Sequence, residues 1–359
     1  MASKKHNYTL ADILGTPRTK QDALSFIRQN TTTDTLEAFN LMDKMYQKKL
    51  LHFIQGNSGL AITYDRVFRP VMMPNDSTER LEAFLSAILG EAIYIKNILP
   101  REGSQISEKG SFIIADIIAS LENGSIINVE IQKIGYMFPG ERCSCYTADM
   151  IMRQYNYLKH QNPNFSYQDM KPVYLIVLME NSPEIFHSTR QYIHRMQTSF
   201  DTGISLNLLD NITLISLDTF ENVVQNISSR QDAWLKFLTT DNPNEIIELV
   251  NRFPEFLSCY RDLIAYRNNP EELICMFSDA LNEMDRNTER YMVEELNKHV
   301  IELKGVVSDL GATIQTQENT IQTQENTIQT QENRIQTQEA TILQLQQKLA
   351  QYEKNNTCP

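Results

Sequence analysis

Apolar residues occur with two alternating spacings in the middle of the chain. Short, almost continuous apolar runs predict buried strands at 172–179 and 212–220. Apolar residues spaced three or four positions apart predict helices at 141–159 and 185–200. This alternation of strands and helices is typical of α/β proteins. From 229 to 290 the pattern is wholly helical, and because proline stops or starts helices, we expect breaks at the prolines of this block, namely Pro243, Pro254 and Pro270.

A β-hairpin is predicted between residues 112 and 132, where two apolar runs flank Glu122-Asn-Gly124. A two-residue turn would place Asp116 opposite Ile131, whereas a three-residue loop places it directly opposite Glu130. We predict the three-residue loop, because Gly124 suits the positive φ of its last position. Gln132 then shares the face of Glu130 and lies opposite Ile114.

The two acids of this hairpin lie inside otherwise apolar strands. Burial of a carboxylate is costly unless it is paired or binds a cation. Directly opposed Cβ atoms lie about 4.5–5.5 Å apart, which is close enough for two carboxylates to share one hard cation. The hairpin therefore indicates a divalent metal site, provided that both side chains face one ion and no arginine fills the space between them. The alternative is that one acid only caps a strand end.

Heptad repeats occupy the C-terminal tail. Thr313-Ile-Gln-Thr-Gln-Glu-Asn319 recurs at 320–326 and 327–333, and a variant follows at 334–340. Position a is valine or isoleucine up to Ile342 and then Leu349, and position d is leucine or glutamine up to Leu345 and then Tyr352. This pattern predicts a coiled coil. It favours a parallel dimer, although the glutamine layers leave a trimer open, and a single solvated tail is the alternative. The isoleucines expected at the oligomer interface are Ile314, Ile321, Ile328, Ile335 and Ile342.

Composition adds constraints on location and partners. The chain has no apolar run long enough for a membrane span and no apolar N-terminal signal segment. Its five cysteines lack C-x-x-C spacing, so we expect reduced thiols in a cytoplasmic protein. The net charge of −12 argues against strong DNA binding. Residues 181–290 account for −8 of this charge, however, so most of it lies outside the segment with the paired acids.

Five short motifs follow one another between residues 60 and 220. They are Asp65-Arg-Val-Phe68-Arg69, Arg80 to Leu89, Asp116 with Glu130-Ile-Gln132, Arg142-Cys-Ser-Cys-Tyr146, and Pro172 to Leu178. None is specific alone, but in this order they resemble the PD-(D/E)XK nuclease family transposases, also called recombination-promoting nucleases. The resemblance implies an α/β fold with a restriction-endonuclease-like core, in which helices flank a central mixed sheet.

The resemblance also implies a chemistry, which is cleavage of DNA phosphodiesters with Mg²⁺ or Mn²⁺. Asp116, Glu130 and Gln132 would be the catalytic residues, and the two acids would be the metal ligands. Gln132 stands where the wider superfamily has lysine, so it can orient a water but supplies no positive charge. Lys133 follows, but in a regular strand it points to the other face. Weak or absent cleavage is therefore an open alternative.

Other residues are accessory candidates. Glu79 or Glu82 would add an acid from the first helix of the family pattern, and the alternative is a solvated helix acid. Arg142 would bind a phosphate in bidentate fashion, or it is an ordinary surface arginine. Tyr146, one helical turn further, is better explained by packing.

The sequence divides into four expected regions: an N-terminal helical arm at 1–59, a nuclease-like core at 60–228, a helical region at 229–290, and a coiled coil with a short tail at 291–359. The arm contains a basic helix, Lys44 to Leu51, for which docking on the core is favoured over DNA contact.

Two functions remain in view, beside a third possibility in which the nuclease core serves mainly as a cap for a coiled-coil scaffold. The first is a metal-dependent DNA endonuclease of a mobile element, acting as a dimer or trimer through its coiled coil. The second is a catalytically weak or inactive nuclease-fold protein that serves as an oligomeric scaffold for DNA or protein. Gln132 and the acidic balance favour the scaffold, whereas the paired Asp116 and Glu130 favour the enzyme.

Overall fold

The computed structural model of the chain describes residues 7–63, 65–101, 116–132 and 140–356, apart from the side chains of 65–66, 279–299 and 352–356. The chain forms two compact units, Met1–Arg286 and Asn287–Pro359. Each is described by itself.

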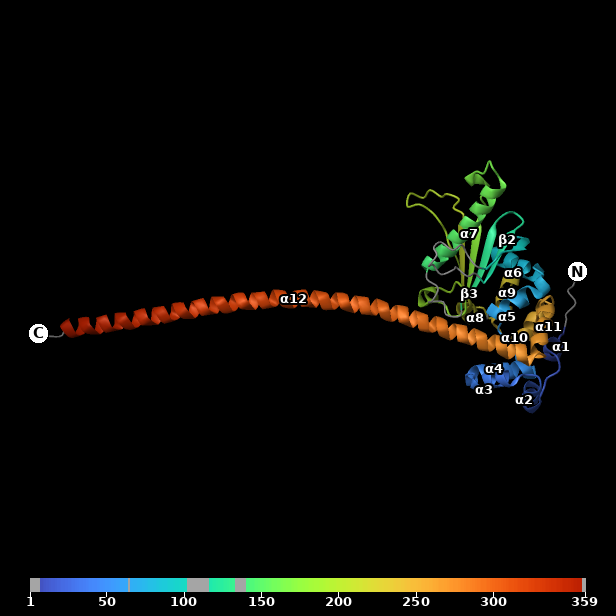
Figure 1. The fold of residues 1–359 in the computed structure, drawn as a ribbon, viewed down its shortest axis with the longest axis horizontal. Helices are drawn as coiled ribbons and strands as arrows, with labels where there is room; N and C mark the ends of the chain where they lie inside the picture. The colour runs from blue at the N-terminus through green and yellow to red at the C-terminus, as the bar shows by residue number, and fades with distance from the viewer. Residues whose placement is uncertain (1–6, 64, 102–115, 133–139, 357–359) are drawn as a thin grey trace. The chain divides into compact units, whose positions relative to one another are not determined.

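The first unit is built around a mixed sheet, to which the described residues contribute six strands in the order β1-β2-β3-β4-β6-β5 (Figure 1). The strands are β1 (Ile95–Ile98), β2 (Ile117–Leu121), β3 (Ile126–Gln132), β4 (Val173–Met179), β5 (Ile193–Arg195) and β6 (Asp210–Ser216). The central strands β3, β4 and β6 run parallel, while β1, β2 and β5 pair antiparallel with their neighbours. The predicted α/β fold with a mixed sheet flanked by helices is confirmed.

The hairpin of β2 and β3 has the register predicted from the three-residue loop. Ile117 pairs with Val129 and Ile118 with Asn128. Gly124 has φ +88°, and its N–H donates to the carbonyl of Leu121. Ile114 and Lys133, for which the sequence predicts positions on opposite faces, lie outside the described residues.

Side chains alternate cleanly between the two faces of the sheet. On β3, Ile127, Val129 and Ile131 belong to the main hydrophobic core, which also takes in the helices of the first unit. Ile126 faces the other way, into a smaller apolar layer that includes Cys143, Tyr146 and Met150 of α7 (Gly140–Gln161). Because strand side chains alternate, Asn128, Glu130 and Gln132 lie on the α7 face.

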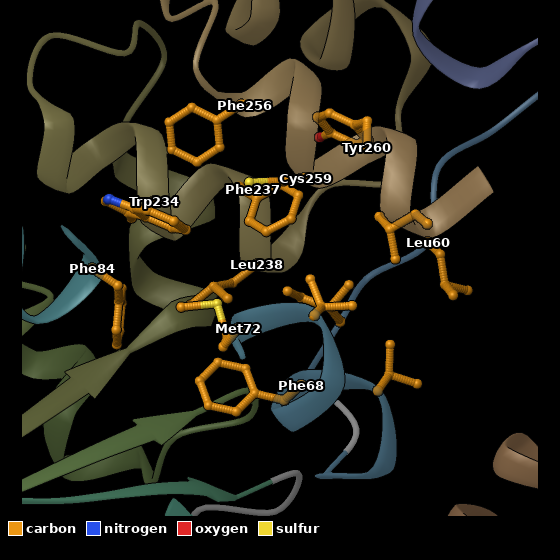
Figure 2. Close-up of a cluster of buried hydrophobic side chains, with 14 of the residues drawn as sticks. Leu60, Phe68, Met72, Phe84, Trp234, Phe237, Leu238, Phe256, Cys259 and Tyr260 are labelled. Atoms are coloured by element: carbon orange, nitrogen blue, oxygen red, sulfur yellow. The ribbon is translucent and has the colours of Figure 1, made fainter. Parts of the chain in front are cut away.

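The main core is covered by short helices from both ends of the unit. Figure 2 shows part of it, in which aromatic rings of α6, α9 and α11 pack edge to face. Phe84 lies 5.9 Å from Trp234, and Phe237 lies 5.2 Å from Tyr260, between ring centroids. The helices are α1 (Leu10–Leu14), α2 (Lys20–Gln29), α3 (Thr33–Leu41), α4 (Lys44–Gln55), α5 (Asp65–Met72), α6 (Glu79–Leu89), α8 (Leu217–Val223), α9 (Arg230–Thr239), α10 (Pro243–Arg252) and α11 (Phe256–Arg267).

The breaks expected at prolines are confirmed. Pro243 is the first residue of α10, and Asn242 caps that helix by accepting from the N–H of Asn244. Pro254 separates α10 from α11, and Pro270 begins α12 (Pro270–Asn356). Proline at a first helical position loses no hydrogen bond, because that N–H has no partner within the helix.

Two predicted elements are wrong in part. The helix expected at 185–200 is a short 3-10 turn, Glu184–Ser188, followed by β5. The exposed edge of β6 offers backbone hydrogen bonds to this segment, and such tertiary pairing overrides local propensity. The strand expected at 212–220 ends at Ser216 and continues as helix α8.

The N-terminal arm is tied to the helical block by one buried arginine. Arg267, at the end of α11, donates to the carbonyls of Leu14, Thr16, Ile54 and Gln55. These carbonyls lie at the C-terminal ends of α1 and α4, where backbone acceptors lack helical partners. The basic helix of the arm lies within α4, whose apolar side buries Leu50, Phe53 and Ile54 in the main core, as the docking alternative expects.

The second unit consists of the C-terminal part of α12. Its described side chains, from residue 300 to 351, are all exposed in the single chain. Across the described part of the chain, none of the helices combines the length and apolarity needed to span a membrane.

Candidate functional site

Asp116 and Glu130 are nearest neighbours on adjacent strands. The backbone N–H of Asp116 donates to Glu130 Oε1 at 3.1 Å, and the N–H of Ile131 donates to Asp116 Oδ2 at 2.7 Å. Both bonds join a backbone N–H to a carboxylate, and they connect Asp116, the residue before β2, to Glu130 and Ile131 of β3. Glu130 is only 1% exposed, and the Asp116 side chain is 12% exposed. The two carboxylates are therefore held close together at the edge of an apolar layer.

Helix α7 covers the face from which Glu130 projects. Burial, together with the charge of Glu130, raises the pKa of the Tyr146 hydroxyl, and burial raises the pKa of the Cys143 thiol to about 11. Both groups are therefore neutral at physiological pH. The charge of Asp116 also acts on Tyr146, which places both acids within electrostatic reach of one helix side chain.

Asn128 is a site residue that the sequence analysis missed. It lies two residues before Glu130 on the same face of β3, is fully buried, and donates from Nδ2 to Glu130 Oε1 at 2.8 Å. Among the described residues its Oδ1 has no hydrogen-bond partner. A polar residue at an inward position of an apolar strand was the available signal, since buried amides are rarely left unsatisfied.

Gln132 ends β3 on the same face as Glu130. It is half-buried, pairs in register with Met179 of β4, and accepts the N–H of Glu180 with its carbonyl at 2.8 Å. The strand therefore presents three polar side chains in a row toward α7, at positions 128, 130 and 132.

Two arginines border the pair of acids. Arg142 donates from Nη2 to the Tyr146 hydroxyl at 2.9 Å, with its guanidinium 5.4 Å from the ring centroid. Arg101 approaches Asp116 Oδ1 at 3.6 Å, and its side chain is 42% exposed. A long, half-exposed ion pair of this kind contributes little stability.

The structure does not bring the first-helix acids to this pair. Glu82 Oε1 accepts from the N–H of Ile95 at 2.8 Å and from Thr78 Oγ1 at 3.1 Å. Ile95 is paired with Leu121, five residues along β2 from Asp116, or about 16 Å at 3.3 Å per residue. Glu79 is exposed in the first turn of α6.

The side chains around Asp116 and Glu130 offer oxygen atoms as possible metal ligands. The described residues contain no group of three or more His, Cys, Asp or Glu that could hold a metal ion. Hard cations such as Mg²⁺ keep several waters and need only one or two carboxylates, whereas structural zinc requires four nitrogen or sulfur ligands. Two carboxylates beside the amides of Asn128 and Gln132 form an oxygen donor set, which fits Mg²⁺ or Mn²⁺.

A second polar cluster, Ser182, His187 and Asp218, has the composition of a hydrolase triad but not its geometry. Ser182 Oγ and Asp218 Oδ2 both contact the same ring nitrogen, His187 Nε2, at 3.1 and 3.0 Å. In a triad the nucleophile and the acid hold opposite nitrogens. Ser182 Oγ also donates directly to Asp218 Oδ1 at 2.8 Å. The cluster therefore fastens the segment after β4 to the start of α8.

Comparison with known proteins agrees with this arrangement. The family described as PD-(D/E)XK nuclease family transposase matches residues 62–289, which is more than half of the chain. No curated protein and no solved structure matches the chain. The match includes the strands that carry Asp116 and Glu130, the helix that carries Arg142, and the helical block after the sheet. It supports a nuclease or transposase type of function, with DNA as the substrate class and divalent metal ions as the usual cofactors of such nucleases. The chain belongs to the PD-(D/E)XK nuclease family transposases.

Proposed function

We propose that the chain is a metal-dependent DNA endonuclease whose site is the pair Asp116 and Glu130. The observation that carries this proposal is a pair of hydrogen bonds across the hairpin. The N–H of Asp116 donates to the Glu130 carboxylate, and the Asp116 carboxylate accepts the N–H of Ile131, the residue after Glu130. Two carboxylates this close repel each other unless a cation or a proton lies between them. A divalent cation supplies the compensating positive charge while both carboxylates stay ionised, whereas a proton would neutralise one of them.

Mg²⁺ or Mn²⁺, held by Asp116 and Glu130, would lower the pKa of a water and stabilise charge on the scissile phosphate. The chain's own residues do the positioning. Asn128 and the N–H of Asp116 hold Glu130 Oε1 in place. Gln132 orients a water through its amide, and Arg142 offers a charged donor to a phosphate at the rim of the site. Tyr146 stays neutral and holds Arg142.

A scaffold without cleavage is the second candidate, and two observations favour it. Gln132 carries no charge to assist the attacking water, and Arg101 already forms an ion pair with Asp116 Oδ1. Under this alternative the arginine takes the place of the metal ion. The fold then serves DNA or protein contact alone.

The proposed enzyme associates with a second copy of itself through the C-terminal helix. The described part of the second unit is a helix that exposes an aliphatic residue at every a position of its heptads. Two copies joined through these helices would carry two sites and make one nick in each strand of a duplex. Light scattering on a chain that stops before Met292 tests this, since the mass per particle should fall to that of one shortened chain. An unchanged number of chains per particle would mean that another surface joins them.

The proposed activity is tested by incubating supercoiled plasmid with the full chain and Mg²⁺ or Mn²⁺. We expect nicking by the natural sequence and none by Asp116→Ala or Glu130→Gln. The matched control is Glu122→Gln, which changes an exposed acid in the loop of the same hairpin and should nick normally. Nicking that persists unchanged in Asp116→Ala would contradict the proposal. DNA binding without nicking by any variant would support the scaffold.

A further inference from the structure

The second unit exposes a continuous aliphatic row that one chain cannot cover. The isoleucines at heptad position a are all more than half exposed, at 53–54%. Leucines at position d flank them, with Leu303 at 62%, Leu310 at 55% and Leu345 at 59%. An apolar row of this length in a single chain marks a protein interface. We call these a and d positions between residues 300 and 349 the seam.

We propose that the seam is covered by a second copy of this chain, oriented parallel and aligned residue for residue. This inference deepens the self-association within the proposed function and rests on it. The exposed aliphatic row indicates only that some partner covers it. The inference adds the direction and the alignment of the second helix.

The pairing of core layers favours the parallel direction. In a parallel pair, a positions meet a positions and d positions meet d positions, so isoleucine layers alternate with glutamine layers. Two facing glutamines hydrogen-bond each other, because each amide has donors and an acceptor. In an antiparallel pair a positions meet d positions, and each isoleucine of the repeats would face a glutamine. Every such layer would bury an amide against an aliphatic side chain.

The charges beside the seam favour the same direction. Position e is glutamate in four successive heptads: Glu318, Glu325, Glu332 and Glu339. An antiparallel pair places e positions opposite e positions, so these glutamates would face one another across the repeats and repel. A parallel pair places each of them opposite position g of the other helix. That position is threonine in three cases and Arg334 in the fourth, which faces Glu339 of the second copy.

The flanks of the repeat set the alignment. Identical heptads alone would permit the two helices to slip by seven residues. Such a slip would place Leu310 against Gln317 and Gln338 against Leu345, which breaks two uniform layers. It would also break both symmetric pairs between Arg334 and Glu339, because one Arg334 would then face Glu332 and the other would face Gln346. The unrepeated ends therefore define the alignment that the repeats leave open.

A parallel pair has a direct consequence for the proposed nuclease. Both chains enter the coil from the same end, so both copies of the first unit are tethered there. An antiparallel pair would separate the two tethers by about 75 Å, the length of 50 helical residues. The parallel pair lets two sites act on one short stretch of DNA.

Disulfide trapping on the full chain tests the inference. In a background with the exposed or terminal Cys145, Cys275 and Cys358 changed to serine, Gln317→Cys and Gln338→Cys are prepared as separate proteins. We expect each to form a covalent dimer with itself on mild oxidation. An antiparallel pair has a single crossing point, so at most one of the two positions can meet its own copy. The matched control is Gln315→Cys, at position b away from the seam, which should not cross-link.

Mixing tests the alignment separately. Gln317→Cys and Gln324→Cys, exchanged together and then oxidised, should give only like-with-like disulfides. An equal yield of the mixed disulfide would overturn the alignment, and failure of either Gln317→Cys or Gln338→Cys to cross-link with itself would overturn the parallel direction. These readouts do not depend on cleavage, so loss of plasmid nicking with intact cross-linking would refute the nuclease and leave this inference standing.

Discussion

Asn128 donates from Nδ2 to Glu130 Oε1 at 2.8 Å, and both residues are buried on the face of β3 that α7 covers. This bond fixes the rotamer of the carboxylate, and groups that orient a metal ligand commonly change metal affinity 10- to 100-fold when removed. We therefore expect Asn128→Ala to weaken Mn²⁺ binding by about 10- to 100-fold. Isothermal titration calorimetry with Mn²⁺ measures this directly. The matched control is Asn211→Ala, which removes an exposed asparagine of β6 and should leave the affinity unchanged. Equal affinity for both variants would mean that Asn128 plays no part in positioning Glu130.

Glu82 is expected to matter for stability and not for cleavage. Its carboxylate accepts the N–H of Ile95 at the start of β1. Ile95 pairs with Leu121 at the end of β2, whereas Asp116 precedes the start of that strand. Glu82→Gln keeps an acceptor at Oε1 but loses the charge, so we expect the free energy of unfolding to fall by about 1 kcal/mol. Plasmid nicking should stay within twofold of the natural sequence. A folded Glu82→Gln protein without nicking would place this acid in the chemistry and contradict the structure.

The orientation of α7 can be tested through two neighbouring cysteines. Cys143 faces the sheet, and burial raises its pKa to about 11, whereas Cys145 is exposed. The thiolate is the reactive form, so at pH 8 Cys143 should react with a thiol reagent on the order of 100-fold more slowly than Cys145. Its rate should rise about tenfold per pH unit until the pH approaches that pKa. Peptide mass spectrometry gives the rate at each cysteine when proteolysis cuts the chain between Cys143 and Cys145. Where it does not, the Cys145→Ser variant gives the rate at Cys143 alone. Equal rates would show that Cys143 is not buried between α7 and the sheet.

Arg267 is expected to be the strongest single contact of the N-terminal arm. Its guanidinium satisfies four backbone carbonyls, and burial together with Arg18 lowers the pKa of Arg267 to about 10. Arg267→Met would remove the donor of the Leu14 and Thr16 carbonyls, whereas the carbonyls of Ile54 and Gln55 keep a donor from Arg18. We therefore expect a loss of about 3 kcal/mol in the free energy of unfolding. Urea denaturation measures it, with Arg261→Met as the control because Arg261 is exposed on the same helix. A loss no larger than that of the control would show that Arg267 does not anchor the arm.

The sequence predicted those parts of the site that depend on local rules. Strand alternation and the positive φ of Gly124 determine the hairpin register, and that register alone brings Asp116 beside Glu130. The proline positions likewise determine where α10 and α12 begin. Both are short-range constraints that one chain segment carries by itself.

Features that depend on distant partners escaped prediction. Strand β5 forms because β6 offers it an edge, a partner some 20 residues further along the chain. The partner of Glu82 is a backbone N–H that no residue type reveals. Asn128 was not predicted because burial of a neutral amide costs less than burial of a carboxylate and so is a weaker signal. The alternation of side chains along β3 does predict that it shares the face of Glu130. Arg101 reaches Asp116 from beyond the end of β1, which no local pattern indicates.

The central claim is that the carboxylates of Asp116 and Glu130 share one divalent cation. Anomalous diffraction from a crystal of the full chain soaked in Mn²⁺ tests it most directly. We expect one manganese peak bound by both carboxylates, with Arg101 displaced from Asp116 Oδ1, and loss of the peak in Glu130→Gln. A manganese ion bound elsewhere, or an Arg101 guanidinium that remains on Asp116 with no manganese peak beside it, would contradict the claim.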